Sequence, residues 1–338
     1  WFPRFDAERF RVLLCSRRGY DKAAEQMERS GIQPMYLGYG KFDIRNFFKL
    51  CRIVREEKVD LIQAHGYGAC LWGHLASIRF GIPLIVHARC NYRTVPWFQR
   101  PIERLFGPRT KHALAVSEST RDFCIRKRHI PAEVIEVLYN GMPMESIQPQ
   151  SEDWIRETRK KYGADETTKV ICIVGRLETY KGLLDAFEAF RRVADEVPEA
   201  VLWVAGDGPY EAALHPWIAE HGMGDRIKLL GFLPDIRDVM WCFDVQLFPS
   251  HREGTPNTLF EALAVGSAIV ASTTDGQGEI LEHEKTGLVF EPGDIETMTE
   301  HLRRILGEAE LRATLSANAR EKSKDFDGQK TVERMQEK

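Results

Sequence analysis

The chain has 338 residues, of which 43% are hydrophobic and 29% charged, and its formal net charge is −3 at pH 7. This length suffices for two domains with separate cores, and the composition is that of a soluble globular protein. No run approaches the roughly 18 consecutive apolar residues of a membrane-spanning helix, and the N-terminus carries no signal-peptide pattern, so we expect a cytoplasmic protein. Seven cysteines without a Cys-x-x-Cys pair or zinc spacing favour buried free thiols in a reducing compartment.

Short β-rich runs alternate with helical stretches along the chain, which predicts parallel sheets with crossover helices and hence an α/β fold. A polar stretch around residues 149–152 divides this alternation into two halves and is predicted to be a linker. The predicted strands of the first half are 10–15, 33–37, 60–64, 83–88, 112–116 and 134–138. Those of the second half are 169–174, 200–205, 227–230, 244–248, 268–271 and 287–290. Two doubly wound domains of this kind predict a ligand cleft at the carboxyl ends of their strands.

The two halves differ in charge. Residues 1–150 carry a net charge of +9 and the remainder −12. A basic first half indicates an anionic partner, for which membrane lipid, a polyanionic ligand and nucleic acid all qualify. Neither a recognition helix nor aromatic residues along a basic groove accompany the charge, so we expect no nucleic-acid binding.

Polar side chains follow several predicted strands of the first half. His65, His87 and Arg89 come at the carboxyl ends of the third and fourth strands, and Ser117 and Asn140 follow the next two. All five are candidates for one wall of the cleft. A structural role is equally open, because buried histidines are commonly hydrogen-bonded, and serine and asparagine favour helix caps and turns.

Residues 91–106 interleave aromatic and basic side chains, among them Trp97 and Phe98 with Arg100 and Arg104. This mixture suits a membrane interface. An ordinary amphipathic helix behind a loop at the rim of the cleft fits the pattern as well, so both alternatives remain open.

Gly175 and Arg176 follow the first strand of the second half, and Lys181 and Gly182 precede a predicted helix. A glycine turn with two cations beside a helix N-terminus suits a diphosphate, which arginine can bind in bidentate fashion and lysine as a point charge. No metal ion is then needed to neutralise the diphosphate. Solvated loop charges are the alternative.

Two further glycine turns follow the next strands. The Gly-Asp-Gly-Pro turn at 206–209 resembles the start of a dinucleotide fingerprint, but Glu211 occupies the place of its third glycine. We therefore expect no nicotinamide cofactor. Gly231 and Phe232 come after the third strand, where a flat base could lie against exposed backbone, although a plain turn fits equally well.

Residues 253–261 are the most informative segment of the chain. Glu253 stands in a strand-to-helix loop, Pro256 and Asn257 open an apolar-periodic helix that ends at Gly266, and Glu261 falls on its second turn. The N–H groups at a helix N-terminus can bind phosphate oxygens, and carboxylates can accept hydrogen bonds from sugar hydroxyls. The segment therefore predicts a nucleotide-sugar site, with solvated glutamates on an ordinary helix as the alternative.

Two other acidic motifs lie nearer the C-terminus. The Asp-Gly-Gln-Gly-Glu run at 275–279 follows the fifth strand and is expected to face the same cleft. Asp325 and Asp327 form an Asp-x-Asp pair, a spacing that holds a divalent cation in some enzymes, but no predicted strand precedes them. We expect the pair to open the final helix and to bind no metal.

Taken together, the motifs resemble those of a known family. Gly-Arg-Leu…Lys-Gly, Gly-Asp-Gly-Pro, Leu-Gly-Phe-Leu-Pro, Pro-Ser-x-x-Glu-Gly-Thr-Pro-Asn…Glu-Ala and Thr-Gly-Leu-Val-Phe-x-Pro-Gly-Asp occur in this order. The chain thus resembles the retaining glycosyltransferases of family 4, also called glycosyl transferases group 1. The resemblance is dense over 169–294 and looser over 10–147. It implies the GT-B fold, in which two Rossmann-like, doubly wound α/β domains face a central cleft.

The resemblance also implies the domain organisation. Residues 1–148 would form the acceptor-binding domain, 149–322 the donor-binding domain, and 323–338 a helix that crosses back to the first domain. Family members usually begin with a strand and a glycine-rich loop. Residues 1–9 match the part of the pattern that follows this point, so we expect the first strand and the glycine-rich loop to be missing from this chain.

By the resemblance, Arg176 and Lys181 would bind the diphosphate of the donor, Glu253 the hydroxyls of the transferred sugar, and Glu261 those of the ribose. The remaining donor-side residues would be Gly231 and Phe232 at the base and Gly254, Thr255, Pro256, Asn257 and Thr258 over phosphate and sugar. His87 would join Glu253, Lys181 and Arg176 at the reacting groups, since the family often has a histidine near this strand end. The acceptor side would include His65, Arg89, Ser117 and Asn140.

The implied activity is transfer of a hexose-type sugar, with retention, from a nucleoside diphosphate sugar to a glycan or lipid-linked acceptor. Such products belong to cell-surface polysaccharide, lipopolysaccharide or glycolipid synthesis, and neither a cofactor nor a metal is expected. A lipid-linked acceptor would bring peripheral contact with the inner face of the membrane. A nucleotide-sugar epimerase or hydrolase of the same fold and a non-catalytic nucleotide-sugar-binding module are the alternatives.

Overall fold

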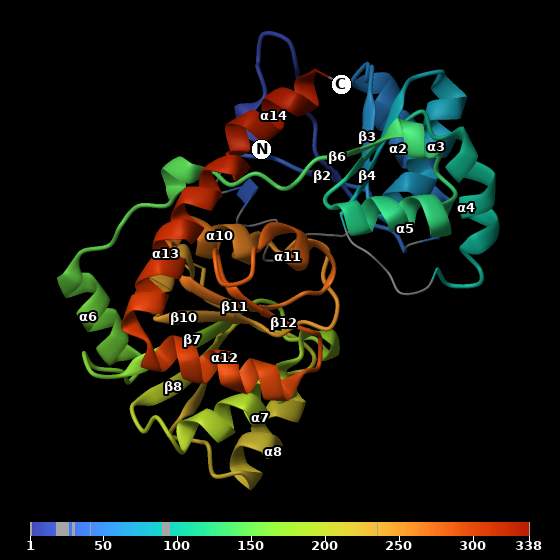
Figure 1. Cartoon of the computed structure of the whole chain (residues 1–338). Coiled ribbons are helices and arrows are strands. Elements are labelled where there is room, and N and C mark those ends of the chain that lie inside the picture. Colours follow the sequence, from blue (N-terminus) through green and yellow to red (C-terminus); the bar gives the residue numbers. More distant parts are fainter. Residues whose placement is uncertain are drawn as a thin grey trace. The chain divides into compact units, whose positions relative to one another are not determined.

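The computed structural model describes residues 2–17, 27–28, 31–40, 42–89, 95–234 and 236–337. They form two compact units, which are considered separately (Figure 1). Unit 1 comprises residues 1–139 and 329–338, and unit 2 comprises residues 140–328.

Unit 1 contains a parallel sheet in the order β3-β4-β5-β6 and a separate parallel pair, β1-β2. The strands are β1 (Cys15–Ser16), β2 (Met35–Tyr36), β3 (Ile62–His65), β4 (Leu84–Ala88), β5 (His112–Ala115) and β6 (Ile135–Val137). The helices are α2 (Arg45–Glu56), α3 (Tyr67–Phe80), α4 (Arg100–Phe106), α5 (Glu118–Arg128) and α14 (Gly328–Gln336). Most strands lie within a residue or two of their predicted positions, but the strand expected at 10–15 is reduced to β1 at its end.

Side chains alternate in direction along each strand of the unit-1 sheet, and both of its faces are covered. Val86 and Ala115 pack in one cluster with Phe123 and Cys124 of α5. Ile85, Leu114 and Leu138 pack in another with Val332 and Met335 of α14. The last helix of the chain is therefore part of the core of unit 1.

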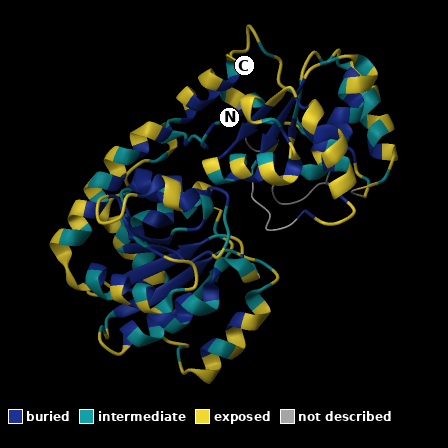
Figure 2. Ribbon diagram, turned by 45° about the vertical axis from the view of Figure 1, so that its right-hand side comes forward, coloured by how far each residue is buried: buried dark blue, intermediate teal, exposed yellow. Residues whose placement is uncertain are grey.

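Unit 2 is built around a parallel sheet in the order β12-β11-β10-β7-β8-β9. The strands are β7 (Lys169–Val174), β8 (Ala200–Ala205), β9 (Ile227–Gly231), β10 (Val245–Phe248), β11 (Ala268–Ser272) and β12 (Leu288–Phe290). The helices are α6 (Glu152–Lys161), α7 (Leu183–Ala194), α8 (Glu211–Glu220), α9 (Ile236–Val239), α10 (Asn257–Val265), α11 (Asp275–Ile280), α12 (Ile295–Gly307) and α13 (Ala309–Ser323). Figure 2 shows the strands of this sheet as buried and the outer faces of the helices as exposed.

The same alternation organises the core of unit 2. Ile171 and Ile173 of β7 pack against α7 and α12, whereas Cys172 and Val174 face the cluster that contains Trp203. Continuous apolar runs such as 169–174 are what a parallel strand buried on both faces requires. These runs made the unit-2 strands predictable from the sequence.

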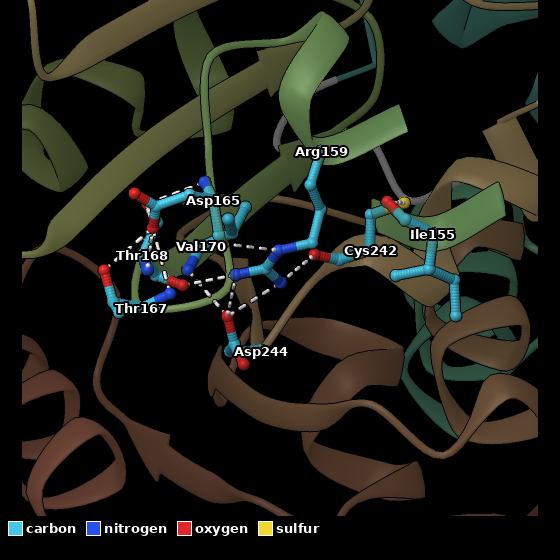
Figure 3. A network of polar contacts seen from close by, with 8 residues as sticks. All are labelled: Ile155, Arg159, Asp165, Thr167, Thr168, Val170, Cys242 and Asp244. Carbon is cyan, nitrogen blue, oxygen red and sulfur yellow. Dashed lines mark hydrogen bonds and ion pairs between the residues drawn. The ribbon is translucent and has the colours of Figure 1, made fainter. Parts of the chain in front are cut away.

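A polar network holds the amino ends of β7 and β10 (Figure 3). Asp244 Oδ2 accepts the N–H of Val170 at 2.8 Å and pairs with Arg159 of α6 at 3.3 Å. Arg159 also donates to the carbonyl oxygens of Cys242, at 2.8 Å, and of Thr168. Strand β10 begins at Val245, one residue later than predicted, and Asp244 directly precedes it. The network fixes the spacing of the two strands whose opposite ends carry the candidate site.

The boundary between the units lies earlier than the predicted linker at 149–152. Residues 140–143 pair with the segment that precedes α14: Met142 N–H donates to Phe326 O, and Gly328 N–H to Met142 O, both at 2.8 Å. These bonds tie residues 140–148 to unit 2, which moves the start of the unit from the expected 149 to Asn140. They also carry unit 2 through 323–328, so the chain returns to unit 1 only at Gln329.

Candidate functional site

The candidate site lies at the carboxyl edge of the unit-2 sheet, where β7 and β10 are neighbours. From β7 the chain continues to β8 and β9 on one side, and from β10 to β11 and β12 on the other. The loops after these two strands diverge at the point where open α/β sheets bind their ligands. Lys181 from the first loop and Glu253 from the second form an ion pair there, with side chains only 17% and 18% exposed. The sequence predicted both residues, and the structure brings them together.

Gly182 explains how the two loops come so close. Its φ is +65°, and a Cβ atom on it would lie 2.0 Å from the carbonyl oxygen of Pro249. Only glycine combines this backbone conformation with this contact. A second link joins the same loops, because His251 N–H donates to Tyr180 O at 2.8 Å. The backbone therefore fixes Lys181 beside the loop of Glu253 independently of the ion pair.

Arg176 lies on the same loop but is solvent-facing. Its Nε atom is 3.0 Å from Oε1 of Glu178, and its side chain is largely exposed. Arg176 and Lys181 thus precede α7 as one exposed and one sheltered cation. The diphosphate site that the sequence predicted for the start of this helix stays a prediction.

The glycines of the 206–209 turn pack against that loop. A Cβ atom on Gly206 would lie 1.8 Å from Gly175 O, and one on Gly208 would lie 2.3 Å from Leu177 O. Leu177 N–H donates to Asp207 O at 2.9 Å. These glycines are needed for the close approach of two backbones.

Three contacts hold the backbone of the Glu253 loop. Glu253 N–H donates to Asp275 Oδ2 at 3.0 Å. Gly276 N–H donates to Gly254 O at 2.8 Å, and Asn140 Nδ2 donates to Thr255 O at 3.3 Å. Sequence analysis placed Asn140 on the acceptor side, but the structure places it in unit 2 beneath the donor-side loop. Its amide fixes backbone there, and its predicted contact with the acceptor stays untested.

Helix α10 begins as predicted. Pro256 is its N-cap and supplies no side-chain acceptor, and Asn257 and Thr258 form its first turn. Glu261 follows on the second turn, where burial raises the pKa of its carboxyl and the charge of Arg237 opposes that shift. The start of α10 and the partly buried carboxyl of Glu261 therefore come shortly after Glu253 in the chain, on the same strand-to-helix connection.

Gly231 ends β9 at the same edge of the sheet, and Phe232 follows it. Gly231 has φ of +68°, and nothing lies within 4 Å of a Cβ atom placed on it. The Phe232 side chain is exposed. The glycine backbone is accessible and the ring beside it is exposed, and their role as a platform for a base stays a prediction.

In unit 1, His65 and His87 are register partners on β3 and β4, with ring centroids 4.7 Å apart. His87 is 0% exposed, and its Nδ1 lies 3.0 Å from Gln63 Nε2. Burial, the neighbouring His65 and the charge of Arg89 hold the pKa of His87 well below its usual range. His65 is accessible to water, yet the protein atoms around its ring and the Arg89 charge lower its pKa to about 4. Both rings are therefore neutral at pH 7, and only His65 is placed to contact a ligand directly.

Ser117 has a structural role in this unit. Its Oγ accepts the N–H of Thr120 at 3.1 Å, and the residue is the N-cap of α5. Ser117 is fully buried. Of the two readings that its position allowed, the helix cap is the one that the structure supports.

Comparison with known proteins identifies the family. Residues 155–322 match "Glycosyl transferases group 1", and residues 3–146 match "Glycosyltransferase Family 4". These two matches tile nearly the whole chain. The chain belongs to the family 4 glycosyltransferases.

Individual relatives agree with this assignment. The chain is 24% identical over 291 residues to an Escherichia coli UDP-Gal:alpha-D-GlcNAc-diphosphoundecaprenol alpha-1,3-galactosyltransferase, covering 83% of this chain and 74% of that protein. It is 28% identical over 284 residues to a 2-deoxystreptamine glucosyltransferase of Streptomyces kanamyceticus, covering 78% and 73%. Anabaena Alr3699/HepE in complex with UDP-glucose has the same fold, with a TM-score of 0.83 at 22% identity over 96% of this chain and 99% of that one. The GT-B fold and glycosyltransferase activity are thereby established for this member of the family.

Two features of this glycosyltransferase concern metals and membranes. Asp325 of the Asp-x-Asp pair forms an ion pair with Lys322 at 3.2 Å, and Asp327 bridges to Met142. Within the described ranges, no three His, Cys, Asp or Glu side chains are grouped so that they could hold a metal ion. No helix among the described residues is long and apolar enough to cross a membrane.

Sequence reasoning missed one residue of the site. Asp275 was noted only as part of a run, yet its carboxylate holds the backbone of Glu253. Its φ is +44°, which is uncommon for a residue other than glycine. The Asp-Gly pair at 275–276 was the available signal, because aspartate tolerates positive φ better than most residues.

Proposed function

We propose that this glycosyltransferase transfers a hexose-type sugar from a UDP-sugar to a lipid-linked or glycan acceptor, with retention of anomeric configuration and without a metal ion. The observation that carries the proposal is the Lys181–Glu253 pair at the point where the loops after β7 and β10 diverge. Names of similar proteins supply the donor and acceptor classes, since they include a UDP-galactose-dependent transferase to a diphosphoundecaprenol-linked sugar.

The charges of the site suit a diphosphate next to a sugar. Lys181 supplies a sheltered ammonium group, Arg176 an exposed guanidinium, and the start of α7 a partial positive charge. Donor phosphates would compete with Glu253 for Lys181, which would turn the Glu253 carboxylate toward the hydroxyls of the transferred sugar. Glu261 would accept from the ribose, and Phe232 would lie at the base.

The same cations support metal-independent transfer. Departure of a nucleoside diphosphate develops negative charge on the leaving phosphate, and two protein cations at that place stabilise it. His65 would contact the acceptor, while the buried His87 holds the neighbouring ring in place through their contact.

The first test is thermal stabilisation of the protein by nucleotides in EDTA. We expect UDP to raise the unfolding temperature more than GDP or ADP does. A ligand present at a hundred times its Kd adds about 2.7 kcal/mol to the stability of the protein. The Lys181→Ala variant should require much more UDP for the same shift. The exposed Lys160 on α6 provides the matched control, and Lys160→Ala should respond like the wild type.

Each part of the proposal can fail separately. Stabilisation that vanishes in EDTA and returns with Mg²⁺ would contradict metal-independent binding. A larger shift with GDP or ADP would reassign the base, and an inverted anomer in the product, seen by NMR, would contradict retention.

A further inference from the structure

Unit 1 carries a cluster of aromatic rings that the donor site does not use, in which Phe42, Trp97 and Phe98 are exposed and Tyr67 is partly buried. We propose that this aromatic patch, formed by Phe42, Tyr67, Trp97 and Phe98, docks the enzyme on an anionic lipid bilayer and so brings it to an acceptor held there. This inference rests on the proposed lipid-linked acceptor and identifies the surface that would meet the membrane.

The rings form one continuous surface. The ring centroids of Trp97 and Phe98 are 6.0 Å apart, those of Phe98 and Phe42 are 5.8 Å apart, and those of Phe42 and Tyr67 are 6.5 Å apart. Trp97 is 79% exposed, and Phe42 and Phe98 are about half exposed. Single exposed apolar residues are ordinary, but contiguous large rings in water mark an interaction surface.

Cations follow two of these rings in the chain. Arg100 and Arg104 are exposed on α4, which begins shortly after Phe98. Within the parts of the chain that the structure describes, neither arginine forms an ion pair with a carboxylate. Aromatic side chains at the interface combined with cations facing lipid phosphates are the chemistry of peripheral binding to anionic membranes.

The position of the patch in the fold connects it with the acceptor. Phe42 follows β2, Tyr67 opens α3 directly after β3, and Trp97 and Phe98 follow β4. Because β3 and β4 are parallel neighbours in one sheet, Tyr67, Trp97 and Phe98 follow strand ends at the edge where His65 ends β3. Phe42 joins them through its ring contacts with Tyr67 and Phe98. A lipid held at the patch would therefore present its head group at the same edge of unit 1 as His65.

The test is flotation of the full chain with vesicles of mixed phosphatidylglycerol and phosphatidylcholine, compared with vesicles of phosphatidylcholine alone. We expect binding to the mixed vesicles only, and weaker binding at high salt because added ions screen the arginines. Replacing both Trp97 and Phe98 by serine should reduce partitioning at least about tenfold. Replacing Arg100 and Arg104 by glutamine should reduce it by about fivefold per residue and flatten the salt dependence.

Ile78 supplies the matched control. It is 66% exposed near the carboxyl end of α3 and lies outside the aromatic patch, so Ile78→Ser should bind vesicles like the wild type. Equal binding of all variants, or no preference for the anionic vesicles, would overturn the proposal. So would a concentration-dependent dimer that the Trp97/Phe98 variant disperses in the absence of vesicle binding, because the patch would then be a surface for a second copy of the chain.

The outcome is separable from that of the proposed function. Stabilisation by UDP reports on unit 2 and should be unchanged in the patch variants. Transfer to a soluble short-chain acceptor should also persist in them, whereas transfer to the same acceptor head group on a long lipid in vesicles should fall. If UDP stabilises the protein but vesicles do not bind, only the docking surface is wrong.

Discussion

Asp275 is the residue whose conformation most clearly serves the site rather than the stability of the fold. Its φ of +44° costs about 1 kcal/mol relative to glycine. In return its carboxylate accepts the N–H of Glu253 and fixes the loop that presents Glu253 to Lys181. We regard Asp275 as a positioning residue, since it acts on the reaction through the backbone of another residue.

Substitutions at Asp275 should separate activity from stability. In Asp275→Gly the backbone strain is relieved and the hydrogen bond is lost, so we expect stability within about 1 kcal/mol of the wild type. Turnover should nevertheless fall at least about tenfold, mainly in kcat, because a displaced catalytic loop is costly to rate. Asp275→Asn retains an acceptor and tolerates positive φ, and should recover most of the turnover. Steady-state kinetics together with chemical denaturation provide both readouts. Equal kcat in the glycine and asparagine variants would show that the hydrogen bond does not matter.

Glu261 combines a raised pKa with a predicted ligand role, which gives its substitution two opposite effects. Because burial raises the pKa of its carboxyl, the folded state holds the proton more tightly than the unfolded chain does. Ionisation therefore destabilises the fold as the pH rises above the unfolded value of about 4.3, and the full cost applies once the pH exceeds the raised folded pKa. We expect Glu261→Gln to be more stable than the wild type at neutral pH, with a difference that disappears near pH 4.

The same variant should bind UDP less tightly, because the glutamine side chain is a weaker acceptor for ribose hydroxyls than a carboxylate is. Urea denaturation over a pH series and a UDP titration measure the two effects. The exposed Glu310 on α13 is the control, and Glu310→Gln should change neither quantity. A loss of stability at neutral pH in Glu261→Gln would contradict the assigned cost of burial.

At the scale of elements, the sequence predicted those parts of the fold that depend on local pattern. Apolar runs gave the unit-2 strands almost to the residue, and Pro256 and Gly266 gave both ends of α10. The strand predicted at 10–15 is shorter in the structure. A strand also needs a partner, and β1 pairs with β2 only through Cys15 and Ser16.

The features that sequence could not supply all depend on residues far apart in the chain. The buried His87 contacts the side chain of Gln63, and Gln63 Nε2 in turn donates to Met335 Sδ of α14 at 3.6 Å. The hydrogen bond from Asn140 to Thr255 joins residues that are 115 positions apart in the chain. No local periodicity encodes such pairings, so the burial of His87 and the place of Asn140 emerged only from the structure. The ligand roles of Arg176, Lys181 and Glu253 stay predictions until they are tested.

At the scale of the whole molecule, each unit has its own sheet and its own core, so we expect them to unfold in two distinguishable transitions. Each transition can be shifted separately, one by a ligand and the other by a substitution. The donor site lies in unit 2, so UDP should raise only the unit-2 transition. Val332 on α14 is fully buried against Ile85 and Leu114 of unit 1, so Val332→Ala should cost unit 1 alone about 2 kcal/mol. Differential scanning calorimetry with and without UDP measures both shifts, and the exposed Lys330→Ala on the same helix should leave both transitions in place.

A single transition that moves as a whole with either UDP or Val332→Ala would mean that the two cores unfold cooperatively. In that case α14, which begins in one unit and packs in the core of the other, would be the element that couples them.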